Sequence, residues 1–350
     1  NLVFDMHGEY GWDGSSEGRS RVKGRKQLFP SKVAVFSLDE ESSKRRGLTP
    51  DHVVTVGLDE VEPEDVDILR QALDLSPVAS DAAYSMHSRF GKGKWLGKFL
   101  ALDAEKLNEV AKEENINIAA LSALQRRLSR LQRFSFMKQK GSRSVDEMLL
   151  YLDRGIHVVL EFGRYGNDLA AYILVANLLT RRIYGKYVER EEKASSNSNK
   201  DSKPLIITIE EAHKYLTKGI ASQTIFGTIA REMRKYQVRL LVVDQRPSDI
   251  DDEVMSQLST KITCLLDSEA DIDKVLMGAP GSRKLRGVLS RMESRQQALV
   301  FGSAVPMPVV FDTRAYGSPE SYRALGWRDA AELKAQVERD AEDLFGPEQA

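Results

Sequence analysis

The sequence predicts an α/β fold with a mostly parallel sheet that is interrupted by a bundle of helices. Short apolar runs alternate with helical patterns along much of the chain, which is the signature of βαβ units. Several of these runs are continuously apolar, as expected of parallel strands that are covered on both faces. Between residues 62 and 150 the strand signal almost disappears and helix follows helix. The sheet is therefore expected to carry a helical insertion.

Strands are expected wherever a short apolar run lies between polar segments. In chain order these runs are Leu2–Phe4, Val33–Phe36, Val53–Val56, His157–Phe162, Pro204–Ile209, Arg239–Val243, Ile262–Leu266, Ala298–Phe301 and Pro308–Phe311. Helices are expected between many of them, over 168–187, 220–236, 251–258 and 270–277. Inside the insertion, apolar residues at helical spacing predict helices over 62–75, 81–100, 103–113 and 118–134.

These patterns also predict how the chain is divided. Residues 1–61 and 151–315 are expected to form the two halves of the α/β core, 62–150 the helical insertion and 316–350 a charged helical tail. The polar stretches 11–28 and 188–203 are expected to be flexible surface loops. The chain opens with Asn1, directly before an apolar strand, so we expect a fragment whose upstream part is missing.

The composition excludes several classes of protein. The chain has 350 residues, of which 41% are hydrophobic, and a formal net charge of -1, which are ordinary globular proportions. The lone cysteine, Cys264, rules out an intrachain disulfide and fits a reducing, cytoplasmic compartment. No apolar run approaches the roughly 20 residues that span a bilayer. Because the charges balance, any contact with DNA must come from a local patch or a ring of subunits.

The strongest motif is an apolar strand that ends in two adjacent carboxylates, Glu210 and Glu211, within Leu205–His213. Ligands of open α/β sheets bind at the carboxyl ends of the strands. Phosphoryl transfer needs one carboxylate near Mg²⁺ and a second that orients or polarises the attacking water. Glu210 suits the first role and Glu211 the second. The alternative is that both acids only end a strand and begin a helix.

A second strand, which ends at Val243, is followed by Asp244-Gln245-Arg246-Pro247-Ser248. The amide of Gln245 can sense a γ-phosphate, and Arg246 can bind phosphate with two hydrogen bonds. Taken alone, this segment is more typical of an ordinary loop that is stopped by proline.

A third strand, Leu2–Phe4, leads into Asp5, His7 and Glu9. A single histidine in a loop usually has only a structural role. Because the carboxyl ends of parallel strands meet at one edge, however, polar clusters after the three strands are expected to converge on one crevice.

Together these segments resemble the HerA branch of the HerA/FtsK superfamily of hexameric P-loop ATPases. Asp5–Tyr10 resembles the family's D-x-H-G-E-Y segment, and Ile209–His213 its Walker B segment, often written D-E-A-H. Ile229–Tyr236 resembles the I-A-R-E-G-R-K-[FY] helix end, and Gln245–Ser248 matches the Q-R-P-S loop. Gly302–Pro308 resembles a late G-x-A-V-x-x-P connection. The order and spacing of the motifs make the resemblance specific over roughly 1–60 and 150–315.

The resemblance implies a RecA-like P-loop NTPase core, ATP and Mg²⁺ as cofactors, and a homohexameric ring that moves along DNA, with double-stranded DNA as the expected substrate. It implies that Glu211 and Glu210 are catalytic, with Glu210 at the metal, and that Asp5, His7, Glu9, Gln245 and Arg246 bind the nucleotide. An arginine supplied to the neighbouring subunit is expected, Arg234 first and then Arg231, which share a helix face. Implied partners are a nuclease such as NurA in DNA end processing, or an effector in anti-phage defence.

The chain departs from the family pattern in four respects. Glu210 stands where the family often has Asp, and Met233 where it often has Gly. No Walker A loop, G-x-x-x-x-G-K-[ST], occurs in the 350 residues, and in the family this loop lies just upstream of the first strand seen here. The family's N-terminal β-barrel is missing as well. We therefore expect this polypeptide by itself to bind nucleotide weakly or not at all.

Other classes of function fit these motifs less well. Glu-Glu-Ala-His also resembles the DEAH-box helicases, but the strand-end Gln245–Ser248 loop and the missing second RecA-like domain argue against them. Zinc sites and nucleophilic triads lack ligands or motifs at the required spacing. A ring scaffold that recruits and activates an effector nuclease, with ATP turnover only regulatory, stays as an alternative.

Basic residues gather in two places. One set lies in the insertion, with Phe134 and Phe136 between its members: Arg126, Arg127, Arg130, Arg133, Lys138, Lys140 and Arg143. A solvated helix face is the favoured interpretation, because the acidic stretch Asp103–Glu114 lies nearby in the sequence, and contact with DNA or a partner is the alternative. A basic run at 19–26 could line a central pore.

Overall fold

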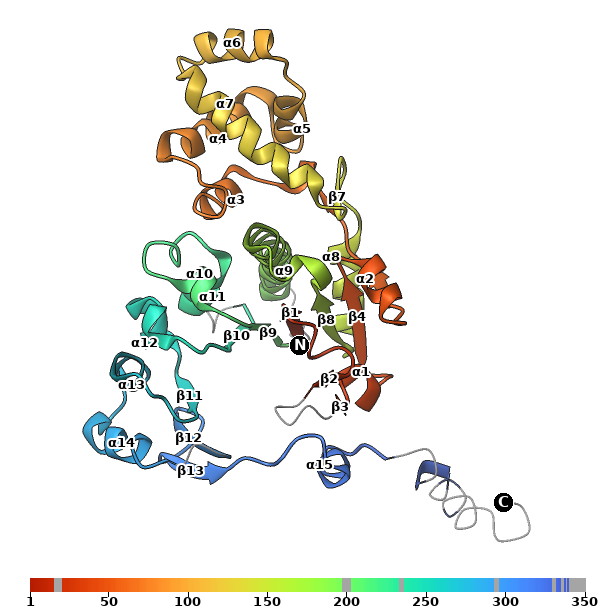
Figure 1. Ribbon diagram of the computed structural model, residues 1–350, viewed down its shortest axis with the longest axis vertical. Coiled ribbons are helices and arrows are strands. Elements are labelled where there is room, and N and C mark those ends of the chain that lie inside the picture. The colour runs from red at the N-terminus through yellow and green to blue at the C-terminus, as the bar shows by residue number, and fades with distance from the viewer. Residues whose placement is uncertain are drawn as a thin grey trace.

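The computed structural model describes residues 1–15, 21–196, 203–232, 236–292 and 296–328, and beyond these 332–334, 337 and 339. A six-stranded sheet lies at the centre of the molecule, with a group of helices above it and a smaller sheet below it in the view of Figure 1. All pairings in the large sheet are parallel. The predicted α/β fold with a mostly parallel sheet is confirmed.

The strand order of the large sheet places the predicted motif strands side by side. The order is β10 (Val238–Val242), β9 (Leu205–Ile209), β1 (Leu2–Asp5), β8 (His157–Glu161), β4 (Val33–Ser37) and β5 (His52–Val53). β9 and β10 pair in parallel, with Leu205 opposite Val238 and Ile209 opposite Val242. The predicted neighbouring, parallel arrangement of these two strands is confirmed.

One face of this sheet is covered by long helices. The helix α9 (Leu169–Ser196) and the helix α11 (Ile225–Glu232) pack on it through aromatic contacts. The Phe4 ring meets the Phe226 ring edge to face, with 6.4 Å between centroids, and the Phe162 ring meets Tyr172 at 4.8 Å. Burial of these large rings is a main source of stability for this layer.

The other face is covered only in part. Val3, Val33 and Val159 form a small buried cluster there, against which Tyr10 and Phe29 pack. At β9 and β10 the same cover is absent among the described residues, and Ile206, Leu241 and Val243 are exposed. The prediction that the strands are covered on both faces is therefore wrong for β9 and β10, although β1 and β4 are buried along their whole length.

Helices form the segment between β5 and β8. Trp95 and Phe99 are fully buried there, and the Trp95 indole N–H donates to the carbonyl of Val61 at 2.7 Å. Their cluster is continuous with the core of the sheet. The helices are α3 (Pro63–Ile68), α4 (Pro77–Phe90), α5 (Trp95–Leu100), α6 (Ala104–Glu113) and α7 (Ile118–Leu128), followed by the 3₁₀ turn η2 (Ser129–Arg133). The division of the chain at 61, 150 and 315 stays a prediction.

Two predicted elements of this region are broken in the structure. The helix expected over 81–100 ends at Gly91, whose φ of 83° and ψ of 155° are open mainly to glycine and do not continue a helix. The strand expected over Val53–Val56 is split, because β5 pairs with β4 whereas β6 (Val56–Gly57) pairs with β7 (Met137–Lys138). The β6–β7 pair closes the base of the helical segment.

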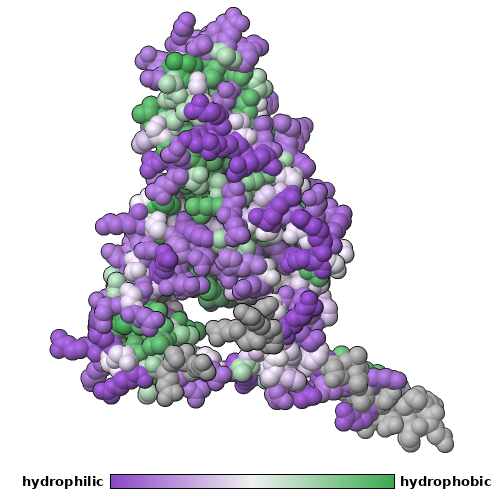
Figure 2. Space-filling model, viewed as in Figure 1, coloured by the Kyte–Doolittle hydropathy of each residue, from purple (hydrophilic) through white to green (hydrophobic). Residues whose placement is uncertain are grey.

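The last three strands of the chain form a separate sheet. β11 (Thr260–Thr263), β12 (Gln297–Gly302) and β13 (Val309–Asp312) pair in antiparallel fashion and pack on α13 (Glu269–Leu276) and α14 (Ser282–Leu289). Hydrophobic residues are visible at the surface of this region in Figure 2, and Ile262, Met307 and Phe311 are among the exposed ones. The last three predicted strands therefore exist but do not extend the parallel sheet.

Shorter elements complete the described chain. They are β2 (Gly14–Ser15), β3 (Arg21–Val22), α1 (Arg25–Leu28), α2 (Glu40–Arg45), η1 (Leu58–Glu60), α8 (Ser144–Asp153), η3 (Gly163–Tyr165), α10 (His213–Leu216), η4 (Pro247–Asp249), α12 (Asp252–Gln257) and α15 (Pro319–Ala324). Both predicted loop segments contain regular structure. Residues 11–28 include β2, β3 and α1, and the first part of 188–203 belongs to α9, which continues to Ser196.

Candidate active site

Carboxylates end three neighbouring strands at one edge of the large sheet. Asp5 ends β1, Glu161 ends β8, and Glu210 directly follows β9. All three side chains are buried, and Asp5 and Glu161 are fully so. The expected convergence of polar groups at the carboxyl edge therefore holds for Asp5 and Glu210.

Asp5 organises the loop that carries His7 and Glu9. Its Oδ1 accepts from the backbone N–H groups of Gly8 and Glu9, at 2.8 and 2.9 Å. Its Oδ2 accepts from the N–H groups of Tyr10 and Gly11, at 2.8 and 3.2 Å. Burial raises the pKa of Asp5, and these bonds oppose that rise. The geometry assigns Asp5 to loop positioning, whereas His7 and Glu9 are exposed on the loop.

Glu210 is a buried acid that lacks one partner. Its Oε2 has no hydrogen-bond partner within the described chain. Burial raises the pKa of Glu210, the nearby Tyr10 hydroxyl lowers it, and Asp5 raises it further. The Tyr172 hydroxyl donates to the Glu210 carbonyl at 3.1 Å, which fixes the backbone at this point. A desolvated carboxylate with a free oxygen at a sheet edge is typical of a functional site.

Glu211 follows in an unusual backbone conformation, with φ of 48°. Its side chain is partly exposed, and its Oε2 lies 3.7 Å from Nε2 of His213. On the other side of the imidazole, Nδ1 of His213 lies 3.0 Å from Oδ2 of Asp244. The Glu211 side chain is therefore partly open to solvent, whereas Glu210 and His213 on either side of it are anchored.

The loop after β10 reaches the same edge. Gln245 and Arg246 are exposed, and the Arg246 backbone N–H donates to Oδ1 of Asp244 at 2.6 Å. Both side chains are open to solvent, and the backbone of this loop is tied through Asp244 to His213.

Arg231, one of the two predicted arginines, does not join this edge in the described part of the chain. Arg231 is exposed near the end of α11, which leads back to the start of β10 and so to the opposite, amino edge of the sheet. Arg234 lies outside the described residues, as does Met233. Arg231 therefore lies away from the carboxyl-edge site of its own chain.

Sequence reasoning missed the Arg46–Glu161 pair. Arg46 follows α2, and its Nη2 lies 2.7 Å from Oε2 of the buried Glu161. The Oε1 of Glu161 has no hydrogen-bond partner among the described groups. The signal was present, because Glu161 ends an apolar run just as Asp5 and Glu210 do.

Two residues of the basic cluster in the insertion, Arg127 and Arg133, have acidic partners. Phe134 and Phe136 are buried, and their rings stack at 5.2 Å between centroids. Arg133 pairs with Asp168 at 3.0 Å, and Arg127 with Asp74 at 2.5 Å. The aromatic residues therefore belong to the core, as the favoured interpretation of this segment expects, and stacking with bases is excluded for them.

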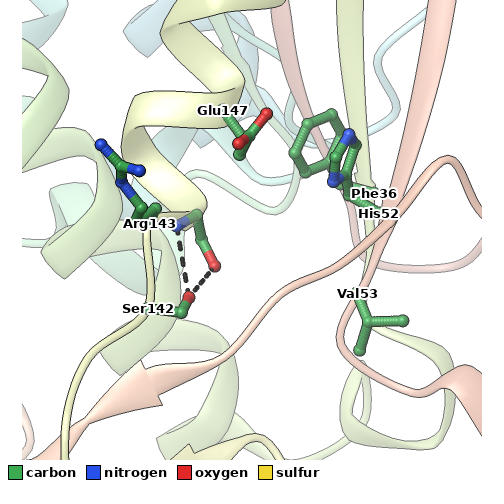
Figure 3. A pocket seen from close by; sticks show the side chains of 7 residues that line it. Phe36, His52, Val53, Ser142, Arg143 and Glu147 are labelled. Atoms are coloured by element: carbon green, nitrogen blue, oxygen red, sulfur yellow. Dashed lines mark hydrogen bonds between the residues drawn. The ribbon is translucent and has the colours of Figure 1, made fainter.

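A small pocket lies away from the carboxylates, where β5 meets the start of α8. It has a volume of about 160 Å³ and is lined by Phe36, His52, Val53, Ser142, Arg143, Ser144 and Glu147. The His52 ring stacks on Phe36 at 4.9 Å, and Arg143 and Glu147 stand on the helical side (Figure 3). Its polar groups are satisfied or solvated, so it does not belong to the candidate active site.

The described part of the chain meets the requirements of neither a metal centre nor a membrane span. It contains no group of three or more His, Cys, Asp or Glu side chains arranged to hold a metal ion. No helix in it combines the length and apolar character that a membrane crossing requires.

The fold has counterparts among solved structures. VirB4 of Thermoanaerobacter pseudethanolicus superimposes with a TM-score of 0.52 at 10% identity, covering 91% of this chain and 82% of that chain. The bacterial conjugative coupling protein TrwB gives a TM-score of 0.53 at 10% identity, covering 91% and 80%. The chain therefore shares its α/β fold with these two proteins, in agreement with the predicted RecA-like core.

A closer relationship comes from the sequence. Residues 1–183 match the family model described as "Helicase HerA, central domain". The chain belongs to this HerA family. Curated relatives are the DNA double-strand break repair helicases HerA of Pyrococcus furiosus, 34% identical over 110 residues, and of Sulfurisphaera tokodaii, 32% identical over 149 residues. The matches cover 31% and 40% of this chain but only 20% and 29% of those proteins.

Proposed function

We propose that this chain supplies the catalytic core of a HerA-type, ATP-driven DNA translocase or helicase. The observation that carries the proposal is the position of Glu210 and Glu211. They lie between the loop organised by Asp5 and the loop of Asp244, Gln245 and Arg246. A buried carboxylate next to a solvent-facing one is what hydrolysis of a phosphoanhydride requires.

Each side chain has a proposed role. Glu211 accepts a proton from, or polarises, the attacking water, because its carboxylate reaches solvent. Gln245 and Arg246 contact the γ-phosphate as neutral and charged donors. His7 and Glu9 face the nucleotide from the loop that Asp5 holds.

Mg²⁺ fits the residues present. The free Oε2 of Glu210 is a hard, buried oxygen, and Mg²⁺ in nucleotide sites is commonly bound by one or two carboxylates together with phosphates and water. When bound, the ion would neutralise charge on the phosphate oxygens. The protein therefore does not need to supply all the ligands of the ion.

The phosphates also need a cradle of backbone N–H groups. β10 forms an edge of the described parallel sheet, and Leu241 and Val243 beside it are exposed. A further parallel strand at this edge would cover them and end next to Asp244. We propose that the phosphate-binding loop reaches the site on such a strand.

The wider setting is part of the same proposal. A homohexameric ring would thread double-stranded DNA and work in the cytoplasm with a nuclease of the NurA type or an anti-phage effector. The HerA relatives, by their names, act in repair of DNA double-strand breaks, and this supports the choice of DNA as substrate.

The test is Glu211→Gln in the full-length protein with its phosphate-binding loop. We expect ATP hydrolysis to be lost and ATP binding to be kept, because the amide preserves shape but removes the charge that polarises water. Glu105→Gln, an exposed acid on α6, is the matched control and should keep wild-type turnover. Normal hydrolysis by Glu211→Gln would defeat the proposal. Loss of translocation with intact effector activation would favour the scaffold alternative.

A further inference from the structure

We propose that Asp244 and His213 are a positioning pair that holds Glu211 in place and links it to the loop of Gln245 and Arg246. This inference rests on the proposed function, since it concerns the same site. The pair was not among the residues expected from the sequence.

Asp244 joins two loops through one carboxylate. Its side chain is only 5% exposed. Oδ2 accepts from the backbone N–H of His213 at 2.6 Å and lies 3.0 Å from the Nδ1 of the same residue. Oδ1 accepts from the backbone N–H of Arg246 at 2.6 Å. A displacement of the Arg246 backbone should therefore also displace His213, because both residues are hydrogen-bonded to the carboxylate of Asp244.

The imidazole of His213 stands between two acids. A carboxylate can only accept, so Nδ1 carries the proton that faces Asp244. Nε2 then faces Oε2 of Glu211 at 3.7 Å, too far for a hydrogen bond. The ring therefore stands between the carboxylates of Asp244 and Glu211 and fills the space on this side of Glu211.

The backbone at Glu211 shows why it needs anchors. Its φ of 48° is unfavourable for a residue with a side chain and persists only when the surroundings impose it. Hydrogen bonds lie on both sides of it: the Tyr172 hydroxyl holds the Glu210 carbonyl at 3.1 Å, and Asp244 holds the His213 N–H. Releasing the second anchor should let Glu211 relax away from its working position.

A simpler interpretation is that Asp244 only satisfies the first N–H of the short helix α10. The chain offers a matched control for that interpretation. Asp251 precedes α12 and accepts from the N–H groups of Glu253 and Val254, at 2.9 and 3.3 Å. Its side chain makes comparable bonds to a short helix, and its tie to α10 runs through its backbone N–H, which donates to the Leu216 carbonyl at 2.7 Å and is kept in Asp251→Asn.

The experiment compares Asp244→Asn, His213→Ala, His213→Asn and Asp251→Asn in the full-length protein. For Asp244→Asn and His213→Ala we expect kcat to fall about 10- to 100-fold, as when a supporting residue lets a catalytic group shift. The dissociation constant for ATP should change by less than about threefold, since Glu211 acts on water rather than on binding. His213→Asn keeps a donor at the Nδ1 position and should recover part of the loss. Asp251→Asn should leave kcat unchanged.

A second arm tests whether His213 acts through Glu211. In a Glu211→Asp background the carboxylate is already displaced, because the side chain is shorter. His213→Ala should therefore lower kcat by a much smaller factor there than in the wild type. The proposal would be overturned if the fold reductions in kcat of Glu211→Asp and His213→Ala simply multiplied in the double variant. Equal reductions in kcat by Asp244→Asn and Asp251→Asn would also overturn it. A loss confined to thermal stability would do the same. If Glu211→Gln itself keeps ATP turnover, the proposed function fails. This outcome can be told apart from failure of the positioning pair, in which Glu211→Gln is inactive but the Asp244 and His213 variants behave like Asp251→Asn.

Discussion

Asp5 and Glu161 lie directly opposite one another at the carboxyl ends of two adjacent parallel strands, and both carboxylates are fully buried. They are stabilised in different ways: Asp5 by four backbone N–H groups, Glu161 by the Arg46 guanidinium. Burial raises the pKa of both, and Asp5 adds to the rise at Glu161. Arg46 thus stabilises an edge where like charges are crowded.

Removing Arg46 should therefore destabilise the fold. We expect Arg46→Ala to lower the free energy of unfolding by about 1–3 kcal/mol, because it leaves a buried carboxylate unpaired. The value is modest since the Arg46 side chain is 37% exposed and partly screened. Urea denaturation at neutral pH measures it. The double variant Arg46→Ala/Glu161→Gln should recover most of the loss, and equal instability of the single and double variants would contradict this account.

Asp65 should make stability depend on pH. It is buried between α3 and α9, and burial raises its pKa from 3.8 to about 6 despite Arg181 at 2.7 Å. Because the folded state favours the protonated acid, this contribution to stability is present below about pH 4 and is lost as the pH rises through 6. The loss should be on the order of 1–3 kcal/mol.

Asp65→Asn removes the titrating group and should flatten the dependence of the unfolding free energy on pH between about 4 and 7. Chemical denaturation at several pH values measures the slope. Asp81→Asn, at an exposed position of α4, is the control and should keep the wild-type slope. An unchanged slope in Asp65→Asn would show that Asp65 titrates normally.

Two glycines should respond in opposite directions to alanine. Gly11 sits against Glu161, and a Cβ there would lie 2.6 Å from its Oε1, so Gly11→Ala should cost about 1–3 kcal/mol. Gly185 lies inside α9 with open space around a Cβ, so Gly185→Ala should add about 0.5–1 kcal/mol. Melting temperatures measure both, and a stabilised Gly11→Ala would mean that Glu161 moves freely.

Mixed rings test the arginine supplied between subunits. Arg234→Ala should assemble and bind ATP but fail to hydrolyse it, since an arginine acting in trans is worth roughly 10³–10⁵ in turnover. Mixing Arg234→Ala with Glu211→Gln subunits should restore part of the activity, because some interfaces then pair an intact Glu211 with an intact Arg234. Arg231→Ala is the parallel variant. Mixed rings that stay inactive, although each variant assembles, would assign Arg234 to its own subunit.

The sequence by itself determined the strand ends. Apolar runs followed by acids located Asp5 and Glu210, and the parallel β9–β10 pair followed from the alternation of strands and helices. Such features are local: hydrophobic periodicity sets the element, and a polar residue at its end marks the edge of the sheet.

Only the tertiary structure decided which side chains meet. Arg46 and Glu161 are 115 residues apart in the chain, and His213 and Asp244 are 31 apart, so no local pattern couples them. The same holds for β11–β13, whose apolar runs resemble core strands but pair with one another in a separate sheet. The left-handed backbone at Glu211 has no sequence signal either, because contacts from β10 and α9 impose it against the preference of the residue.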